Sequence, residues 1–184
     1  MSKLSRDVNL SFSLVAILWV VFLVDLILPA DLRVLGLRPR SIDGLFGIAL
    51  MPFLHGNLRH LMANTGALFV LLLVGFSFSR KITFKALMII WILGGLLVWL
   101  FARGNTVHIG ASGIIFGLVG YLMMVGFFRR ELIALVFSLL VFFLYGGSLI
   151  TLFIHIPGVS WTGHFFGFLS GITAAWSTKT GKTA

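Results

Sequence analysis

The sequence predicts an all-α polytopic membrane protein, a single domain over residues 1–184 with six transmembrane helices in a bundle. The composition is the first reason: hydrophobic residues make up 59% of the chain and charged residues 10%, against roughly 45–50% and 25% in soluble proteins. The second reason is a set of six apolar runs, most of them close to the ~20 residues that a helix needs to cross a bilayer. These runs are residues 10–28, 58–78, 84–101, 112–128, 132–154 and 161–176.

The first run is predicted to be a retained helix. Lys3 and Arg6 precede it, as in a signal peptide, but no Ala-x-Ala cleavage site follows it. Pro29 ends this run, and residues 30–57 then mix charged with apolar side chains. Such a mixture is typical of a loop that lies partly in the membrane interface.

Charged, aromatic or turn-forming residues close each later run. They are Arg80 and Lys81 after the second, Arg103 after the third, Arg129 and Arg130 after the fourth, His155, Pro157 and Gly158 after the fifth, and Trp161 and Trp176 around the sixth. The two tryptophans are typical of interfacial anchors. The Pro157–Gly158 loop is a candidate moving part.

The distribution of basic residues predicts that both termini are cytoplasmic. With six spans and the N-terminus inside, nine basic residues lie inside: Lys3, Arg6, Arg80, Lys81, Lys85, Arg129, Arg130, Lys179 and Lys182. Five lie outside: Arg33, Arg38, Arg40, Arg59 and Arg103. This asymmetry follows the positive-inside rule. It also explains the net charge of +9 without a nucleic-acid partner, so the bilayer is the expected surrounding.

In this topology, polar residues from three helices meet at one depth. His60 and Asn64 lie in the first turns of the second run, Ser112 opens the fourth, and His164 opens the sixth. All three runs go from outside to inside. Polar side chains in a membrane usually face a cavity or a protein partner, so the pattern predicts one wet site that opens to the outer side.

Glycines on the fourth and sixth runs predict close helix packing beside that site. They are Gly113 and Gly117, with Gly120 near the same face, and Gly163, Gly167 and Gly171. Such small-residue faces let membrane helices approach closely. If the two faces meet, the Ser112 hydroxyl comes within ~3 Å of the His164 imidazole, the distance that a general base requires.

The remaining parts of an acyl-transfer site are also present. His60 and Asn64 share a helix face and offer N–H groups to an oxyanion, together with the Ser112 backbone N–H at a helix start. Asp25 is the only acid predicted within a run, and nothing places it near His164. The histidine spacing does not match a metal motif, and no metal or other cofactor is expected.

Each of these residues also has an ordinary structural interpretation. Ser112 is equally typical of a helix cap, the glycines of packing alone, and the His60–Asn64 pair of a hydrogen bond between helices. His108 and His155 are most simply loop or interfacial histidines.

The ordered set of motifs resembles the rhomboid intramembrane serine proteases. The motifs are His55-x4-His60-x3-Asn64, Gly110-x-Ser112-Gly113 and His164-x2-Gly167-x3-Gly171, one on each of the second, fourth and sixth runs. The resemblance implies a serine endopeptidase that cleaves transmembrane segments of membrane proteins. It makes Ser112 the nucleophile and His164 the base, with His60, Asn64 and the Ser112 N–H as oxyanion donors. It also gives His55, Gly110, Gly163 and Gly167 supporting roles.

Two positions depart from the family pattern. Phe116 stands where many members have a Tyr that stacks on the catalytic histidine, and Phe46-Gly47 stands near the place of a Trp-Arg pair. Phe116 keeps the ring and loses the hydroxyl. The resemblance further implies a bacterial inner-membrane location.

Two other functions stay open at this stage. A non-proteolytic member of the fold would bind or escort membrane helices, although such relatives usually lack the Ser or the His. A small transporter would be expected to show internal repeats, which the sequence does not have. The sequence leaves the substrate, the gating element and the oligomeric state undetermined.

Overall fold

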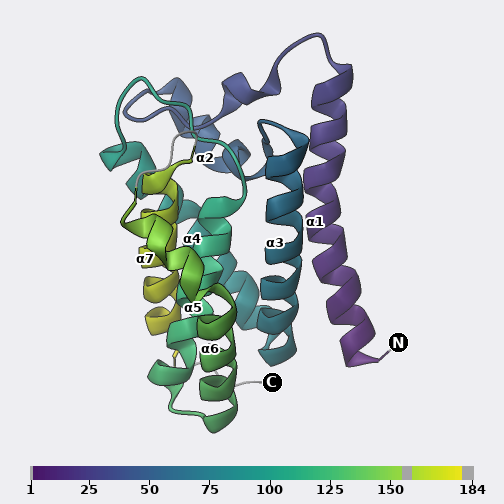
Figure 1. The fold of residues 1–184 in the computed structure, drawn as a ribbon, viewed down its shortest axis with the longest axis vertical. Coiled ribbons are helices and arrows are strands. Elements are labelled where there is room, and N and C mark those ends of the chain that lie inside the picture. Colours follow the sequence, from purple (N-terminus) through teal and green to yellow (C-terminus); the bar gives the residue numbers. More distant parts are fainter. Residues whose placement is uncertain (1, 155–158, 180–184) are drawn as a thin grey trace.

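The computed structural model describes residues 2–154 and 159–179, so His155, Pro157 and Gly158 lie outside the described residues. The described residues form an all-helical bundle without β-strands, apart from one isolated bridge (Figure 1). Its α-helices are α1 (Lys3–Ile27), α2 (Phe46–Leu50), α3 (Leu58–Phe78), α4 (Arg80–Phe101), α5 (Ser112–Arg129), α6 (Leu132–Tyr145) and α7 (Trp161–Ser177). Short 3-10 helices are η1 (Leu32–Leu35), η2 (Asp43–Leu45), η3 (Met51–Phe53) and η4 (Gly146–Leu152).

Five helical segments of the described chain are long and apolar enough to cross a membrane. They are α1, α3, α4, α5 and α6 with its continuation η4. The predicted membrane bundle is therefore confirmed. The sixth predicted span, α7, has 17 residues and is not among these five, so its crossing stays a prediction.

Two helices begin earlier than the hydropathy pattern predicts. α1 begins at Lys3 rather than near residue 10, because the Ser2 side chain accepts a hydrogen bond from the Ser5 N–H and caps the first turn. It therefore contains a buried acid, Asp7, whose carboxylate lies 2.5 Å from the Arg80 guanidinium. Arg80 opens α4, four residues before the predicted start. The ion pair joins α1 to α4 and neutralises both charges.

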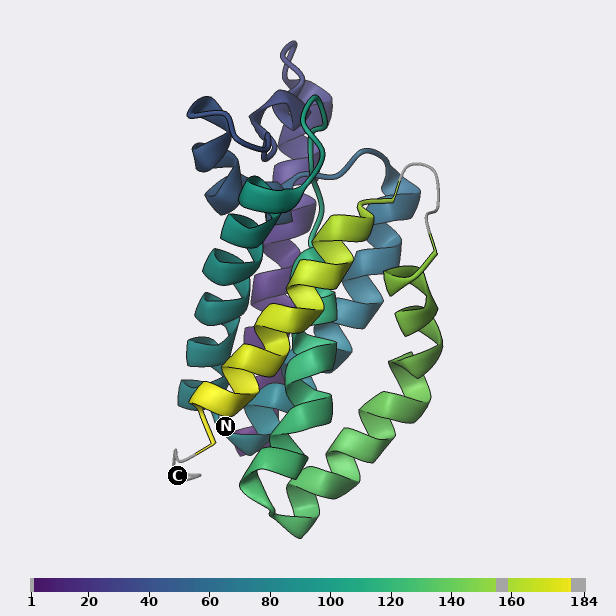
Figure 2. The same ribbon diagram turned by 90° about the vertical axis from the view of Figure 1, so that its left-hand side faces the viewer.

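α5 and α7 form the closely packed centre of the bundle (Figure 2). A Cβ atom added to Gly167 would lie 2.2 Å from the Gly113 carbonyl oxygen, and one added to Gly171 would lie 1.9 Å from that of Gly117. Backbone therefore touches backbone, and no larger residue fits there without a shift. The predicted meeting of the two glycine faces is confirmed.

The segment between α1 and α3 is anchored to α4 by hydrogen bonds. The Trp91 indole donates to the Ile48 carbonyl at 2.7 Å, and the Arg40 guanidinium donates to that of Ala102 at 2.7 Å. Phe46 is 74% exposed at the start of α2. Exposed apolar side chains on an anchored segment agree with the predicted interfacial loop.

The first turn of α1 and the last turn of α7 lie at the same end of the bundle (Figure 1). At the opposite end the chain after α4 rises and then runs back down into the bundle, where α5 begins (Figure 2). An antiparallel bridge between Leu37 and His108 fastens this descending segment. As a result, Ser112 starts α5 below the surface of the bundle.

Candidate active site

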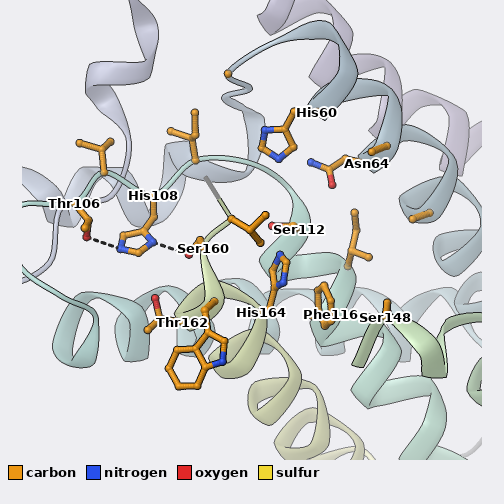
Figure 3. A pocket seen from close by; sticks show the side chains of 18 of the residues that line it. His60, Asn64, Thr106, His108, Ser112, Phe116, Ser148, Ser160, Thr162 and His164 are labelled. Atoms are coloured by element: carbon orange, nitrogen blue, oxygen red, sulfur yellow. Dashed lines mark hydrogen bonds between the residues drawn. The ribbon is translucent and has the colours of Figure 1, made fainter. Parts of the chain in front are cut away.

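A pocket of about 1170 Å³ lies near the start of α3, α5 and α7, at the end of the bundle opposite to the first turn of α1 (Figure 1). Figure 3 shows side chains that line it. Its lining comes from α3 and the residues just before it, the segment before α5, α5 itself, the end of α6, η4, and α7 with the residues just before it. His60, Asn64, Ser112, Phe116 and His164 all line it. The structure thus brings together the predicted polar residues of three helices in one place.

Gly110 explains how Ser112 reaches this pocket. Its φ of 107° lies in a region that L side chains rarely adopt. A Cβ atom there would lie 2.7 Å from the His60 ring and 3.6 Å from the Asn64 amide nitrogen. The Gly110 N–H also donates to the Met51 carbonyl at 2.7 Å. Glycine therefore lets the chain turn into α5 against the two polar side chains of α3.

His164 is held by an aromatic stack. The Phe116 and His164 rings are 4.0 Å apart between centroids and nearly parallel, with an interplanar angle of 16°. The stacking expected for Phe116 is confirmed. It fixes the plane of the imidazole beside the start of α5.

The Ser112 and His164 side chains lie close together in Figure 3, and both line the pocket. Their helices touch one residue beyond Ser112, where the Gly113 carbonyl meets Gly167. Within the described residues, however, no hydrogen bond joins the Ser112 hydroxyl to the imidazole. The roles of both residues therefore belong to the proposal below.

His55 orients the amide of Asn64. Its Nδ1 lies 3.2 Å from the Phe53 carbonyl, which can only accept, so Nδ1 carries the proton. Its Nε2 then accepts from the Asn64 amide nitrogen at 3.0 Å. The His60 ring packs edge-on against His55 at 5.0 Å. His55 thus contacts both Asn64 and His60, and its supporting role stays a prediction.

Acid is expected to destabilise the folded protein through His55. Burial lowers the pKa of this imidazole from 6.5 to about 4, so between these values the unfolded chain binds more protons. The contribution of His55 to the free energy of unfolding is therefore fully present above pH 6.5 and is lost as the pH drops towards 4. Thermal unfolding in detergent across this range measures the effect.

The His55→Gln variant separates this contribution from that of other groups. Its unfolding midpoint should depend less on pH between 6.5 and 4 than that of the wild-type protein. Burial also lowers the pKa of His108, so some dependence should remain. An unchanged slope in the variant would show that His55 is not the group involved.

Sequence reasoning missed a second network, which ties the segment before Ser112 to α7. His108 is buried, with Nδ1 2.7 Å from the Ser160 hydroxyl and Nε2 2.9 Å from that of Thr106. Ser160 also accepts from the Gly163 N–H at 3.0 Å and so caps α7. His108 does lie in a loop, but it links the two segments that carry Ser112 and His164. A serine three residues before Gly163 was the available signal.

Comparison with known proteins decides the family. The Rhomboid domain family matches residues 43–180. The chain belongs to the rhomboid family. The resemblance read from the three motifs is thereby confirmed, and the helical bundle is that of an integral membrane protein.

Bacteria provide several relatives of this rhomboid. An uncharacterized protein of Mycobacterium tuberculosis is 44% identical over 172 residues, which cover 88% of this chain and 71% of the relative. One of Mycobacterium leprae is 39% identical over 171 residues, covering 88% and 67%. A Bacillus subtilis protein, named as a candidate rhomboid protease, is 27% identical over 177 residues, covering 92% and 86%.

Proposed function

We propose that this rhomboid is an intramembrane serine endopeptidase that cleaves transmembrane segments of membrane proteins with Ser112 and His164. The observation that carries the proposal is the His164 ring, stacked on Phe116 in the pocket that Ser112 enters. Family membership supports the reaction class. In this proposal the substrate lies in the bilayer, both termini lie in the cytoplasm, and the pocket opens to the outer side.

The first step is acylation. The Ser112 Oγ attacks the scissile carbonyl carbon while His164 Nε2 takes the hydroxyl proton. The tetrahedral intermediate then collapses, the C–N bond breaks, and His164 returns the proton to the leaving amine. Water hydrolyses the acyl-enzyme by the same sequence, with His164 again as the base.

The oxyanion is stabilised by donors from α3 and α5. His55 occupies one amide hydrogen of Asn64, which leaves the second for the developing charge. His60 lines the same pocket, and its ring lies next to Gly110, just before the start of α5. The backbone N–H of Ser112 is a further donor, and it lies at the N-terminus of α5, where the helix dipole favours negative charge.

The substrate must unwind before it is cut, because a helical peptide bond in a membrane is shielded by its own hydrogen bonds. The pocket suits an unwound segment. It extends from Ala63 and Ala67 on α3 to Tyr145 at the end of α6 and Ser148 in η4.

Covalent labelling tests the proposal. A fluorophosphonate probe should modify Ser112 in the detergent-solubilised protein, because only an activated serine reacts readily with it. Mass spectrometry of the digested adduct locates the modified residue. A folded protein without an adduct at Ser112 would instead favour a rhomboid that binds or escorts membrane helices.

A further inference from the structure

A threonine outside the predicted site contacts the His164 imidazole. The Thr151 hydroxyl oxygen lies 3.2 Å from His164 Nδ1. Thr151 belongs to η4, the 3-10 helix that continues α6. The contact therefore comes from a different element than the Phe116 stack on α5.

The direction of this hydrogen bond follows from the other bond of Thr151. Its hydroxyl lies 2.7 Å from the Ser148 carbonyl oxygen, which can only accept. The hydroxyl proton is therefore used there, and towards His164 the oxygen can only accept. Nδ1 of His164 must carry a proton for the contact to be a hydrogen bond. Nε2 of the neutral ring is then left with its lone pair.

The stack and the hydrogen bond restrict different motions of the ring. Stacking on Phe116 fixes the plane of the imidazole, but a half-turn about the Cβ–Cγ bond would give the same plane with the two ring edges exchanged. The bond from Nδ1 to Thr151 distinguishes the two edges. η4 is itself held against α7, because the Trp161 indole N–H donates to the Leu152 carbonyl.

We infer that Thr151 is a positioning residue for the reaction, a neutral hydroxyl that holds His164 in the tautomer with a free Nε2. The inference rests on the proposed function. Among the described residues, the lining of the pocket contains no Asp or Glu that could orient His164. In serine proteases with a triad a carboxylate has this task.

The hydrogen bond strengthens as the reaction proceeds. When Ser112 gives its proton to Nε2, the ring becomes an imidazolium, and Nδ1–H becomes a charged donor to Thr151. The Nδ1 proton stays in place, and Thr151 exchanges no proton. The interaction is stronger in the transition state than in the resting enzyme, so it acts on kcat.

Variants of Thr151 test the role. Thr151→Val keeps the shape and removes the hydroxyl, and it should lower kcat at least about tenfold with KM within about twofold. Thr151→Ser should restore most of the activity. Thr173→Val is the matched control, because Thr173 makes a comparable bond to the Leu169 carbonyl on α7 but none to His164. It should keep wild-type kcat.

Nitrogen NMR of histidine-labelled protein reads the tautomer without any activity. The His164 signals, assigned by comparison with His164→Gln, should show a protonated Nδ1 in the wild-type protein and a mixture of tautomers in Thr151→Val. A protonated Nε2 in the wild type would overturn the inference, even if Thr151→Val failed to fold. So would an unchanged kcat in folded Thr151→Val. A wild-type protein that neither cleaves a substrate nor is labelled at Ser112 would refute the proposed function. The NMR result would still decide which nitrogen of His164 carries the proton.

Discussion

Replacing Ser112 by Ala is expected to lower cleavage of a transmembrane substrate by at least about a thousandfold. The loss follows from the proposed role of Ser112 as the nucleophile: the chain has no cysteine to replace it, and the hydroxyl of Thr151 that contacts His164 is on the Nδ1 side of the ring. Cleavage is measured in liposomes that contain the protein and a single-span substrate, with the products separated by gel electrophoresis.

The loss in His164→Ala should be of similar size, and the double variant should be no slower than either single one. A nucleophile and its base act as a unit, so their effects do not add. Ser77→Ala is the matched control, because this exposed serine lies at the end of α3 away from the pocket and should cleave like the wild type. Wild-type cleavage by Ser112→Ala or by His164→Ala would refute the dyad.

Most of the helical bundle could be predicted because a membrane helix is recognised from its own stretch of sequence, by its length and hydropathy. The starts of α1 and α4 could not. Asp7 and Arg80 are 73 residues apart in the sequence, and each looks like the charged end of a span. Only their contact neutralises the charges and lets both helices extend beyond the hydrophobic window.

The site was predictable where chemistry depends on spacing within a helix, and less so where it depends on tertiary contacts. His60 and Asn64 share a face at any helical position four residues apart. The glycine faces of α5 and α7 likewise predict which helices meet. Thr151 carries no such signal, and the place of Ser160 before Gly163 predicts a helix cap but not its contact with His108, since the histidine partners of both hydroxyls come from other elements.

Replacing Gly171 by Ala is expected to destabilise the protein by about 3 kcal/mol or more, the upper end of the cost of overpacking. The added Cβ would lie 1.9 Å from the Gly117 carbonyl oxygen and 2.9 Å from the Tyr121 backbone nitrogen. Both are backbone atoms, so no side-chain rotation relieves the contact. α5 and α7 must move apart, and the close packing at the centre of the bundle is lost along both helices.

Gly66→Ala provides the matched control, because it makes the same chemical change within α3 where a Cβ would meet no atom within 4 Å. It should leave stability unchanged or raise it by up to about 1 kcal/mol through helix propensity. Reversible unfolding in mixed micelles compares the two variants. Equal stabilities would show that the contact between α5 and α7 can relax cheaply. If instead only Gly171→Ala is weakened, its labelling at Ser112 should slow as well, because the same contact brings Ser112 and His164 together.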